Sequence, residues 1–392
     1  MEGIVLRKIG KQEIEDIAVG AALLGTGGGG DPYIGKLMAL QAIDEFGPVT
    51  LIEPDEVPDD ALVVPSAMMG APTVMLEKVP SGEEAIEAFL KLEEFLGEKI
   101  YATFPIEAGG LNSMLPFVLA ARLGLPVVDA DGMGRAFPEL QMVTFYLDGI
   151  SATPAVLADE KGNTVLLSTI DNLWTERIAR AATVQMGGSA MTAMYSMRGI
   201  NLKKSGIPNI LQLEADIGRS IRLAKENNVN PLQEVLNIVN GFKLFEGKII
   251  DVDRKTESGF AKGIATIEGL NEYEGETLKL YFQNEHLLAR TDREILCVTP
   301  DLIAVLDAET SIPITTEGIR YGARCVVIGI PCHPKWRTEK GIATVGPGYF
   351  GYDVDYIPVE ELVKQRGRNK GTTPGWWICR RFRRTTLCCH IR

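Results

Sequence analysis

The first 168 residues alternate between helix-like and strand-like apolar patterns. Ile14, Ile17, Ala21 and Leu24 recur every three or four positions, which predicts a helix over residues 12–24. The same reasoning predicts these further elements: helix 33–46, strands 49–52 and 62–65, helix 83–96, strand 100–104, helix 113–123, strand 127–129 and a hairpin over 154–168. Such alternation is typical of an α/β domain with a mostly parallel sheet and helices on both faces.

The pattern changes in the second half of the chain. Helical spacing predicts a long stretch over 171–198, interrupted at Gly187 and Gly188, and then helices over 209–227 and 231–239. From about residue 242 onward, strands follow one another without helices between them: 248–252, 263–267, 278–282, 295–298, 302–306 and 325–330. Closely spaced strands predict a small barrel or sandwich, so we expect helices and a β-barrel-like module here.

Charge sets the end of the chain apart. Residues 366–392 hold eight basic side chains and no acid, and without them the net charge of -12 becomes -20, from 32 basic and 52 acidic groups. An acidic body argues against binding nucleic acid or anionic membranes through bulk charge. The tail has no helical or strand period and is typical of out-of-frame or otherwise aberrant sequence; a functional basic tail is the alternative. We therefore expect three parts: 1–168, 169–364 and 365–392.

Further features of the sequence bear on where in the cell the protein is expected. No apolar run approaches the ~20 residues that span a bilayer, and the first residues lack the basic and apolar regions of a signal peptide. Three of the six cysteines lie in the tail, so the body has too few for a disulfide framework. A cytoplasmic protein is therefore expected.

A glycine-rich loop follows the first predicted helix. The segment 30–36 nearly spells a phosphate-binding loop, but Leu37 replaces the Ser or Thr that magnesium needs and Pro32 lacks an N–H, so we reject a nucleotide site. Consecutive glycines permit close approach of a ligand, and N–H groups at a helix start attract anions. A tight turn between helices is the alternative. The candidate substrate-binding residues here are Thr26, Gly27, Gly28, Gly29 and Asp31.

A second segment, 105–112, leaves a predicted strand and enters a helix. Ligands of open α/β sheets bind outside the carboxyl ends of strands, which is where Glu107 is expected. A capped glycine turn explains Asn112 but not Glu107. Glu107 is therefore a catalytic candidate, and Gly109, Gly110 and Asn112 are candidates for substrate binding.

A third segment, 129–139, also leaves a predicted strand. Asp129 and Asp131 are close enough in sequence to bind a cation together, or to raise one another's pKa so that one serves as a general base. Arg135 and Glu139 are candidates for substrate binding. The alternative is that Asp129 caps the loop and that Arg135 pairs with Glu139.

The segment 331–336 follows the last predicted strand. Cys332 is a candidate nucleophile and His333 a candidate metal ligand, although a lone Cys or His is more often structural. With three histidines in the whole chain, any metal must rely on carboxylates, and Asp129, Asp131 and His333 form the candidate set for a divalent ion such as zinc. His286 is a further, weaker candidate.

Four motifs in order carry a family resemblance: Gly25-Thr26-Gly27-Gly28-Gly29, Glu107-x-Gly109-Gly110-x-Asn112, the run from Asp129 to Glu139, and Gly346-Pro347-x-x-Phe350-Gly351-Tyr352-Asp353. Together they resemble the S-methyl-thiohydantoin desulfurase-like family over about residues 7–363. The resemblance implies an α/β domain followed by a region with a β-barrel. It also implies a link to hydantoinase and oxoprolinase proteins, which open five-membered cyclic amides. Members of the family typically end soon after the segment that matches 356–360.

Two functions follow as expectations. The first is a hydrolase that attacks a C=N, C=S or C=O carbon of a hydantoin-like or thiohydantoin-like ring with activated water. Asp131 or Glu107 would activate the water, the glycine loop would stabilise negative charge, and Arg135 would bind a substrate carboxylate. The second is a non-catalytic accessory subunit of a hydantoinase or oxoprolinase complex; a homo-oligomer is a further candidate assembly. For the enzyme, we expect segments 25–31, 107–112 and 129–139 to meet in one cleft.

Overall fold

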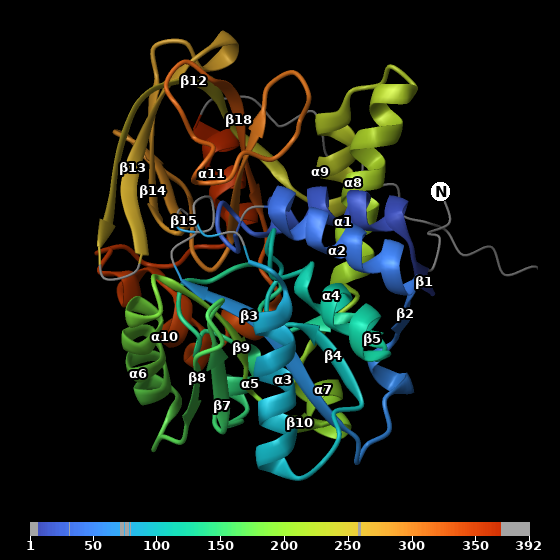
Figure 1. Cartoon of the computed structure of the whole chain (residues 1–392). Helices are drawn as coiled ribbons and strands as arrows, with labels where there is room; N and C mark the ends of the chain where they lie inside the picture. The colour runs from blue at the N-terminus through green and yellow to red at the C-terminus, as the bar shows by residue number, and fades with distance from the viewer. Residues whose placement is uncertain are drawn as a thin grey trace, which may run out of the picture.

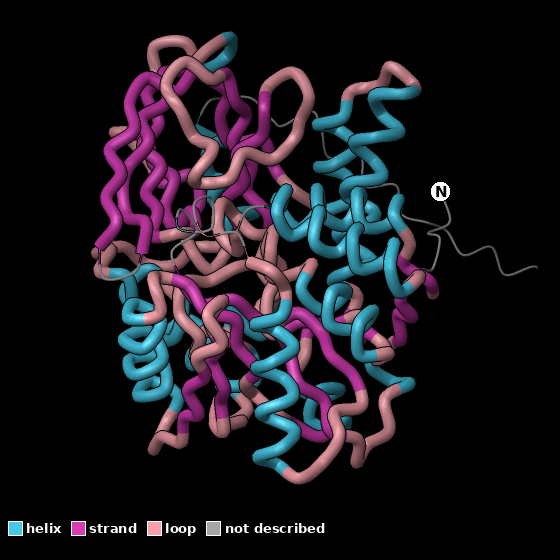
Figure 2. Tube along the Cα trace, in the orientation of Figure 1, coloured by secondary structure: helices cyan, strands magenta, loops and turns pink. Residues whose placement is uncertain are grey.

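The chain folds into a large sheet with helices, a β-rich module and a helical layer beside the module (Figures 1 and 2). The computed structural model describes residues 7–369 apart from 31, 71–73, 75–77, 79 and 258–259. Its helices are α1 Lys11–Leu24, α2 Pro32–Phe46, α3 Glu83–Leu96, α4 Leu115–Leu123, α5 Thr144–Leu147, α6 Asn172–Gln185, α7 Gly199–Ser205, α8 Ile210–Glu226, α9 Pro231–Val239, α10 Glu339–Val345 and α11 Val359–Asn369. No helix among the described residues is both long enough and apolar enough to cross a bilayer.

The large sheet has nine strands among the described residues, in the order β1-β2-β5-β4-β3-β9-β7-β8, with β10 paired to β3. Its strands are β1 Lys8–Ile9, β2 Val49–Ile52, β3 Leu62–Gly70, β4 Ala102–Pro105, β5 Val127–Val128, β7 Ala155–Ala158, β8 Thr164–Leu167, β9 Ser189–Ala193 and β10 Met197–Arg198. The central strands β2, β5, β4 and β3 run parallel, as the alternating pattern predicted. The remaining pairs are antiparallel.

The long helical stretch predicted over 171–198 is wrong in its second half. Helix α6 starts where expected, because Asp171 accepts a hydrogen bond from the N–H of Trp174 and caps the helix. After Gly187 and Gly188, both at positive φ, the chain instead forms β9 between β3 and β7. The large sheet therefore takes two strands, β9 and β10, from beyond residue 168.

The β-rich module is an antiparallel seven-stranded sheet that curls into a half-barrel. Its order is β16-β15-β14-β13-β12-β18-β17, with β12 Phe242–Glu257, β13 Phe260–Gly269, β14 Thr277–Gln283, β15 Glu285–Thr291, β16 Ile295–Val298, β17 Leu302–Asp307 and β18 Arg324–Ile330. The sequence pattern predicted every strand except β15. A further small ladder pairs β6 Ala130–Asp131 with β11 Ile207–Pro208.

Helices α1 and α8 pack with their backbones in contact, and this contact positions the glycine-rich loop that follows α1. A Cβ on Gly20 would lie 2.0 Å from the carbonyl oxygen of Glu214, and one on Gly218 would lie 1.9 Å from that of Asp16. Only glycine fits at such a crossing, because any side chain would force the helices apart. Arg222 of α8 then pairs with the carboxylate of Asp16 on α1 at 2.7 Å.

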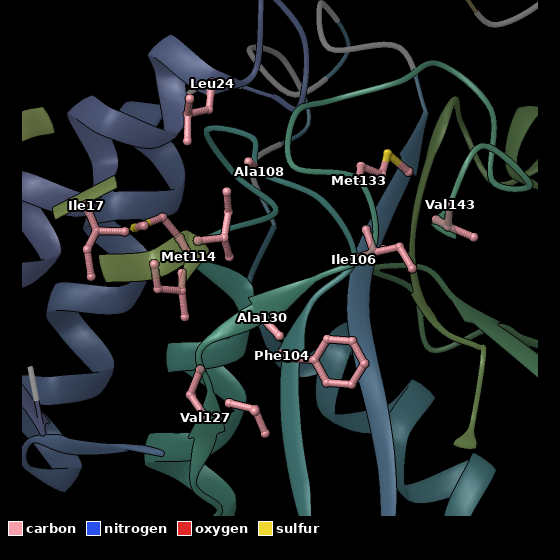
Figure 3. Close-up of a cluster of buried hydrophobic side chains, with 14 of the residues drawn as sticks. Ile17, Leu24, Phe104, Ile106, Ala108, Met114, Val127, Ala130, Met133 and Val143 are labelled. Carbon is pink, nitrogen blue, oxygen red and sulfur yellow. The ribbon is translucent and has the colours of Figure 1, made fainter. Parts of the chain in front are cut away.

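The main hydrophobic core fills the space between the large sheet and these helices. Figure 3 shows part of it, where Ile17 and Leu24 of α1 lie across from Met114, and Phe104 and Val127 lie on the strands below. All five side chains are at most 2% exposed. This burial fixes the carboxyl ends of β3 and β4 relative to α1.

The predicted tail begins inside a helix. Helix α11 extends to Asn369, and Arg366 forms ion pairs of 2.9 Å with both Glu276 and Glu294 of the β-rich module. The first residues of the tail therefore belong to the fold, contrary to the sequence expectation. The stretch 370–392, with its cysteines and tryptophans, lies outside the described residues.

Candidate functional site

A cavity with both polar and apolar lining residues opens where the large sheet meets the β-rich module. Its volume is about 70 Å³, counted as space open to the centre of a water-sized sphere. It lies beyond the carboxyl ends of β3 and β4, where open α/β sheets place their ligands. The residues that line it are Gly29, Gly30, Ala67, Met68, Met69, Gly70, Ile106, Glu107, Asn112, Met133, Phe137, Pro138, Glu139, Leu140, Arg180, Thr192, Met194, Asn284 and Glu285.

The glycine loop has no room for side chains. A Cβ on Gly29 would lie 2.4 Å from the Cα of Gly109, and a Cβ on Gly28 would lie 1.8 Å from Oε1 of Glu285. The β-rich module contacts the loop directly, since the N–H of Thr316 donates to the carbonyl of Gly27 at 2.9 Å. The loop is therefore clamped between the 107–112 segment and the β-rich module.

Glu107 lies on the cavity wall and is held in place from both sides. Its Oε1 accepts a 2.6 Å hydrogen bond from the amide of Asn112, and its Oε2 accepts one of 3.2 Å from the N–H of Phe137. Asn112 in turn accepts from the N–H of Met68 in β3 at 2.8 Å. Burial raises the pKa of Glu107 to about 7, against the lowering effects of Asn112, Phe137 and Arg135. A carboxyl with this pKa exchanges protons readily near neutral pH.

Glu285 contributes a second carboxyl group to the cavity from the start of β15. It is 2% exposed. Within the described part of the chain, its Oε2 has no hydrogen-bond partner. Burial, and then the charge of Glu107, raise its pKa well above the ordinary value. The neighbouring Asn284 takes a positive φ of 58° and is fixed by a 2.8 Å bond from the N–H of Ala261 to its side-chain oxygen.

The mouth of the cavity is formed by Arg180 and Glu139. Arg180 pairs with Glu176, donates to the carbonyl of Pro138 at 3.0 Å, and stacks over the ring of Phe260 with 4.1 Å to its centroid. Glu139 accepts a 2.6 Å hydrogen bond from the hydroxyl of Tyr349. Before any ligand arrives, Arg180 is thus ion-paired and Glu139 is hydrogen-bonded.

Asp131 and Asp129 do not reach the cavity, contrary to the sequence expectation. The carboxylate oxygens of Asp131 accept from the N–H of Gly134 at 2.8 and 2.9 Å, and the side chain is 0% exposed. Asp129 accepts from the N–H of Leu211 at 2.8 Å and thereby caps α8. Burial raises the pKa of both carboxyls, while their N–H donors oppose this rise. Neither carboxyl lines the cavity, so neither is placed to act as a base on a ligand bound there.

Arg135 is also directed away from the cavity. Its guanidinium donates to the carbonyls of Ala136, Pro300, Asp301 and His286 and to the hydroxyl of Thr26, at 2.9 to 3.3 Å. The side chain is 0% exposed, so no substrate carboxylate can reach it. Arg135 instead ties the 129–139 segment to the β-rich module.

The other predicted binding residues separate into two groups. Gly29, Asn112 and Glu139 line the cavity. Thr26, Gly27, Gly28, Gly109 and Gly110 lie behind the lining, where Thr26 accepts from Arg135 and Gly110 packs on Gly30. Asp31 lies outside the described residues.

Cys332 and His333 lie apart from the lining residues as well. Burial raises the pKa of Cys332 to about 12, which leaves it a thiol rather than a nucleophilic thiolate. His333 caps a short 3₁₀ turn, where its ring nitrogen accepts from the N–H of Lys335 at 3.3 Å. The described residues hold no group of three or more His, Cys, Asp or Glu side chains arranged to bind a metal. The predicted donors Asp129, Asp131 and His333 therefore do not fit a metal ion.

Three lining residues with charged or amide side chains were missed by sequence reasoning: Glu285, Asn284 and Arg180. Glu285 is the first residue of the unpredicted β15 and Asn284 directly precedes it, in a segment where the sequence suggested only His286 as a candidate. His286 is buried behind Gly27, with its Nδ1 3.0 Å from the carbonyl oxygen of Ile303. The sequence feature that could have predicted them is the run Gln283-Asn284-Glu285, in which a turn residue, Asn284, precedes a carboxyl residue at the start of a strand.

Comparison with known proteins agrees with this architecture. A crystal structure of a protein from Chromobacterium violaceum superposes with a TM-score of 0.73 at 24% identity, covering 90% of this chain and 100% of that one. At that identity the likeness establishes the fold alone. No curated protein matches. The profile of the S-Me-THD-like N-terminal domain matches residues 12–169, and that of the S-Me-THD-like C-terminal domain matches residues 170–359. The chain therefore belongs to the S-Me-THD-like family.

Proposed function

We propose that this protein hydrolyses a small thiohydantoin-like or hydantoin-like ring in the cavity, with Glu107 and Glu285 as its two proton-transferring groups. The observation that carries the proposal is the pair of buried carboxyls that line one cavity, each with a raised pKa. Membership of the S-Me-THD-like family supports a thiohydantoin-related role. Glu107 and the glycine loop belong to two of the four motifs that carried the sequence resemblance.

The environments of the two carboxyls suggest their roles. Glu107, with a pKa of about 7, takes a proton from water that attacks a ring carbon. Glu285, whose pKa is raised by burial and whose Oε2 has no hydrogen-bond partner among the described residues, donates a proton to the ring nitrogen or leaving group. For an S-methylated ring, water adds to the C=N carbon, the C–S bond breaks, and a hydantoin and methanethiol are released. The N–H groups of the glycine loop are the nearest candidates to stabilise the developing charge.

Turnover of a ring panel by the purified full chain tests the proposal. The panel consists of an S-methyl-thiohydantoin, a thiohydantoin and a hydantoin, with thiol release and ring absorbance as readouts. Glu107→Gln and Glu285→Gln should each lower kcat by about 10²–10⁴-fold, as expected when a positioned acid or base is lost. Absence of turnover across the panel, or full activity of both variants, would contradict the proposal.

Glu214→Gln is the matched control. Glu214 is also a fully buried carboxyl with a raised pKa, and its Oε2 likewise has no hydrogen-bond partner among the described residues. It accepts from the hydroxyl of Ser113 at 2.7 Å and does not line the cavity. Its substitution should leave kcat unchanged, so a loss confined to Glu107 and Glu285 separates chemistry from general disturbance of buried acids.

An accessory role in a hydantoinase or oxoprolinase complex is the second candidate, and an exposed apolar face favours it. This face consists of Ile170, just before α6, and of Trp174 and Ile178 on α6; their side chains are 86%, 44% and 42% exposed, respectively. Apolar groups gathered on a surface often mark a partner site. Pulldown of tagged full chain with such subunits tests this role, with Trp174→Glu as the variant that should abolish capture. Turnover by the isolated chain would count against it.

A further inference from the structure

Beyond the cavity mouth lies a wider groove that no motif predicted. It is lined by Glu139, Leu173, Glu176, Arg177, Arg180, Ala181, Val184, Phe260 and Tyr349. Its volume is about 500 Å³ on the measure that gives about 70 Å³ for the cavity. Glu139 and Arg180 line both spaces, so the groove continues the cavity outward.

The inner cavity is the smaller of the two adjoining spaces. On the same measure its volume of about 70 Å³ compares with about 500 Å³ for the groove. A large substituent on a ring bound beside Glu107 and Glu285 can extend past Arg180 and Glu139 into the groove.

The groove offers an apolar surface to that substituent. The charges of Arg180 and Glu176 are paired with each other, and Glu139 already accepts from Tyr349. Arg177 lies over the ring of Trp174, 5.2 Å from its centroid. What remains for a ligand is the surface of the apolar lining residues Leu173, Ala181, Val184, Phe260 and Tyr349.

We propose that the groove is a substituent subsite, which makes the preferred substrate a five-membered cyclic amide carrying an apolar or aromatic side chain. This inference rests on the proposed function and adds the substrate class. Hydrophobic contacts of this kind discriminate by about tenfold or more for each well-buried methylene. A benzyl-substituted ring should therefore have a kcat/KM at least tenfold above that of its methyl-substituted counterpart.

The test compares methyl-, isobutyl-, benzyl- and carboxyethyl-substituted rings on wild type and three variants. Leu173→Asn and Val184→Asn remove apolar surface from the groove. Leu90→Asn on α3 is the matched control, since Leu90 is 42% exposed and Leu173 38% exposed. The first two should lower the benzyl-to-methyl ratio of kcat/KM at least fivefold, and the control should leave that ratio unchanged.

Two outcomes separate failure of the subsite from failure of the proposed function. Turnover of all rings with equal kcat/KM, or preference for the carboxyethyl ring, overturns the subsite while the hydrolase proposal stands. If wild type hydrolyses none of them, the hydrolase proposal fails, and calorimetric binding of the benzyl ring decides the subsite. Binding that is tighter than for the methyl ring and weakened by Leu173→Asn supports the subsite, whereas equal binding of the two rings overturns it.

Discussion

Substitution of Arg135 is expected to destabilise the fold rather than to weaken substrate binding. Its guanidinium satisfies four backbone carbonyls and one hydroxyl, and three of those carbonyls, from His286, Pro300 and Asp301, belong to the β-rich module. Arg135→Met removes every donor and leaves the acceptors buried. Because burial lowers the pKa of Arg135 to about 10, the charge itself carries a desolvation cost that methionine does not.

The magnitude follows from these two opposing effects. A buried acceptor left without a donor costs about 1–3 kcal/mol, so four carbonyls at the low end cost roughly 4 kcal/mol. Relief of the buried charge offsets part of that cost. We therefore expect Arg135→Met to lower the free energy of unfolding by about 2–4 kcal/mol. Arg135→Lys should cost about 1–2 kcal/mol less, because an ammonium donates at most three of the five hydrogen bonds.

Urea unfolding of the full chain, followed by circular dichroism and analysed by linear extrapolation, measures these differences. Arg320→Met is the control, because Arg320 is exposed and should change the free energy of unfolding by less than about 0.5 kcal/mol. A cost below about 1 kcal/mol for Arg135→Met would refute the bridging role. An unchanged stability with a raised KM for anionic rings would restore the role in substrate binding that the sequence suggested.

Three further predictions follow from the site. Asp131→Asn should lower the free energy of unfolding by about 1–3 kcal/mol in urea titrations, because its amide would face the N–H of Gly134; a neutral effect would show that the loop rearranges. Gly29→Ala should lower the melting temperature much more than Gly47→Ala: both have positive φ, but only at position 29 would the Cβ meet backbone, 2.4 Å from Gly109. Equal shifts would contradict that packing. Burial raises the pKa of Glu107 in the folded state to about 7, against about 4.5 in the unfolded state. Ionisation of Glu107 should therefore lower the free energy of unfolding as the pH rises from about 4.5 to about 7, by up to about 1.4 kcal/mol per pH unit. The difference in unfolding free energy between Glu107→Gln and wild type should therefore shift in favour of the variant from pH 5 to pH 8, while wild-type kcat/KM should rise through pH 7; a pH-independent difference would contradict the raised pKa.

The sequence alone was sufficient for most elements of the fold. Local periodicity predicted α1, α3 and the parallel strands, because the spacing of apolar residues reports which face of an element is buried. It failed at β9, whose small residues Ser189–Ala193 also suit a helix and form a strand because β3 and β7 flank them. It also failed at β15, which follows β14 after a single turn residue, Asn284.

The residues that line the cavity were predictable only in part. The sequence placed Glu107 correctly at the end of β4, since the position of a residue after a parallel strand sets the edge at which it lies. The sequence could not show which of Glu107, Asp131 and Arg135 lines the cavity. A charged side chain forms hydrogen bonds with buried backbone groups that lack partners, and the sequence does not show where those groups lie. Only the tertiary structure shows that Arg135 donates to carbonyls of the β-rich module. It also places Glu285 in the same cavity as Glu107, although the two are 178 residues apart in the sequence. Which carboxyl lines the cavity is therefore decided by long-range packing, which local sequence patterns do not encode.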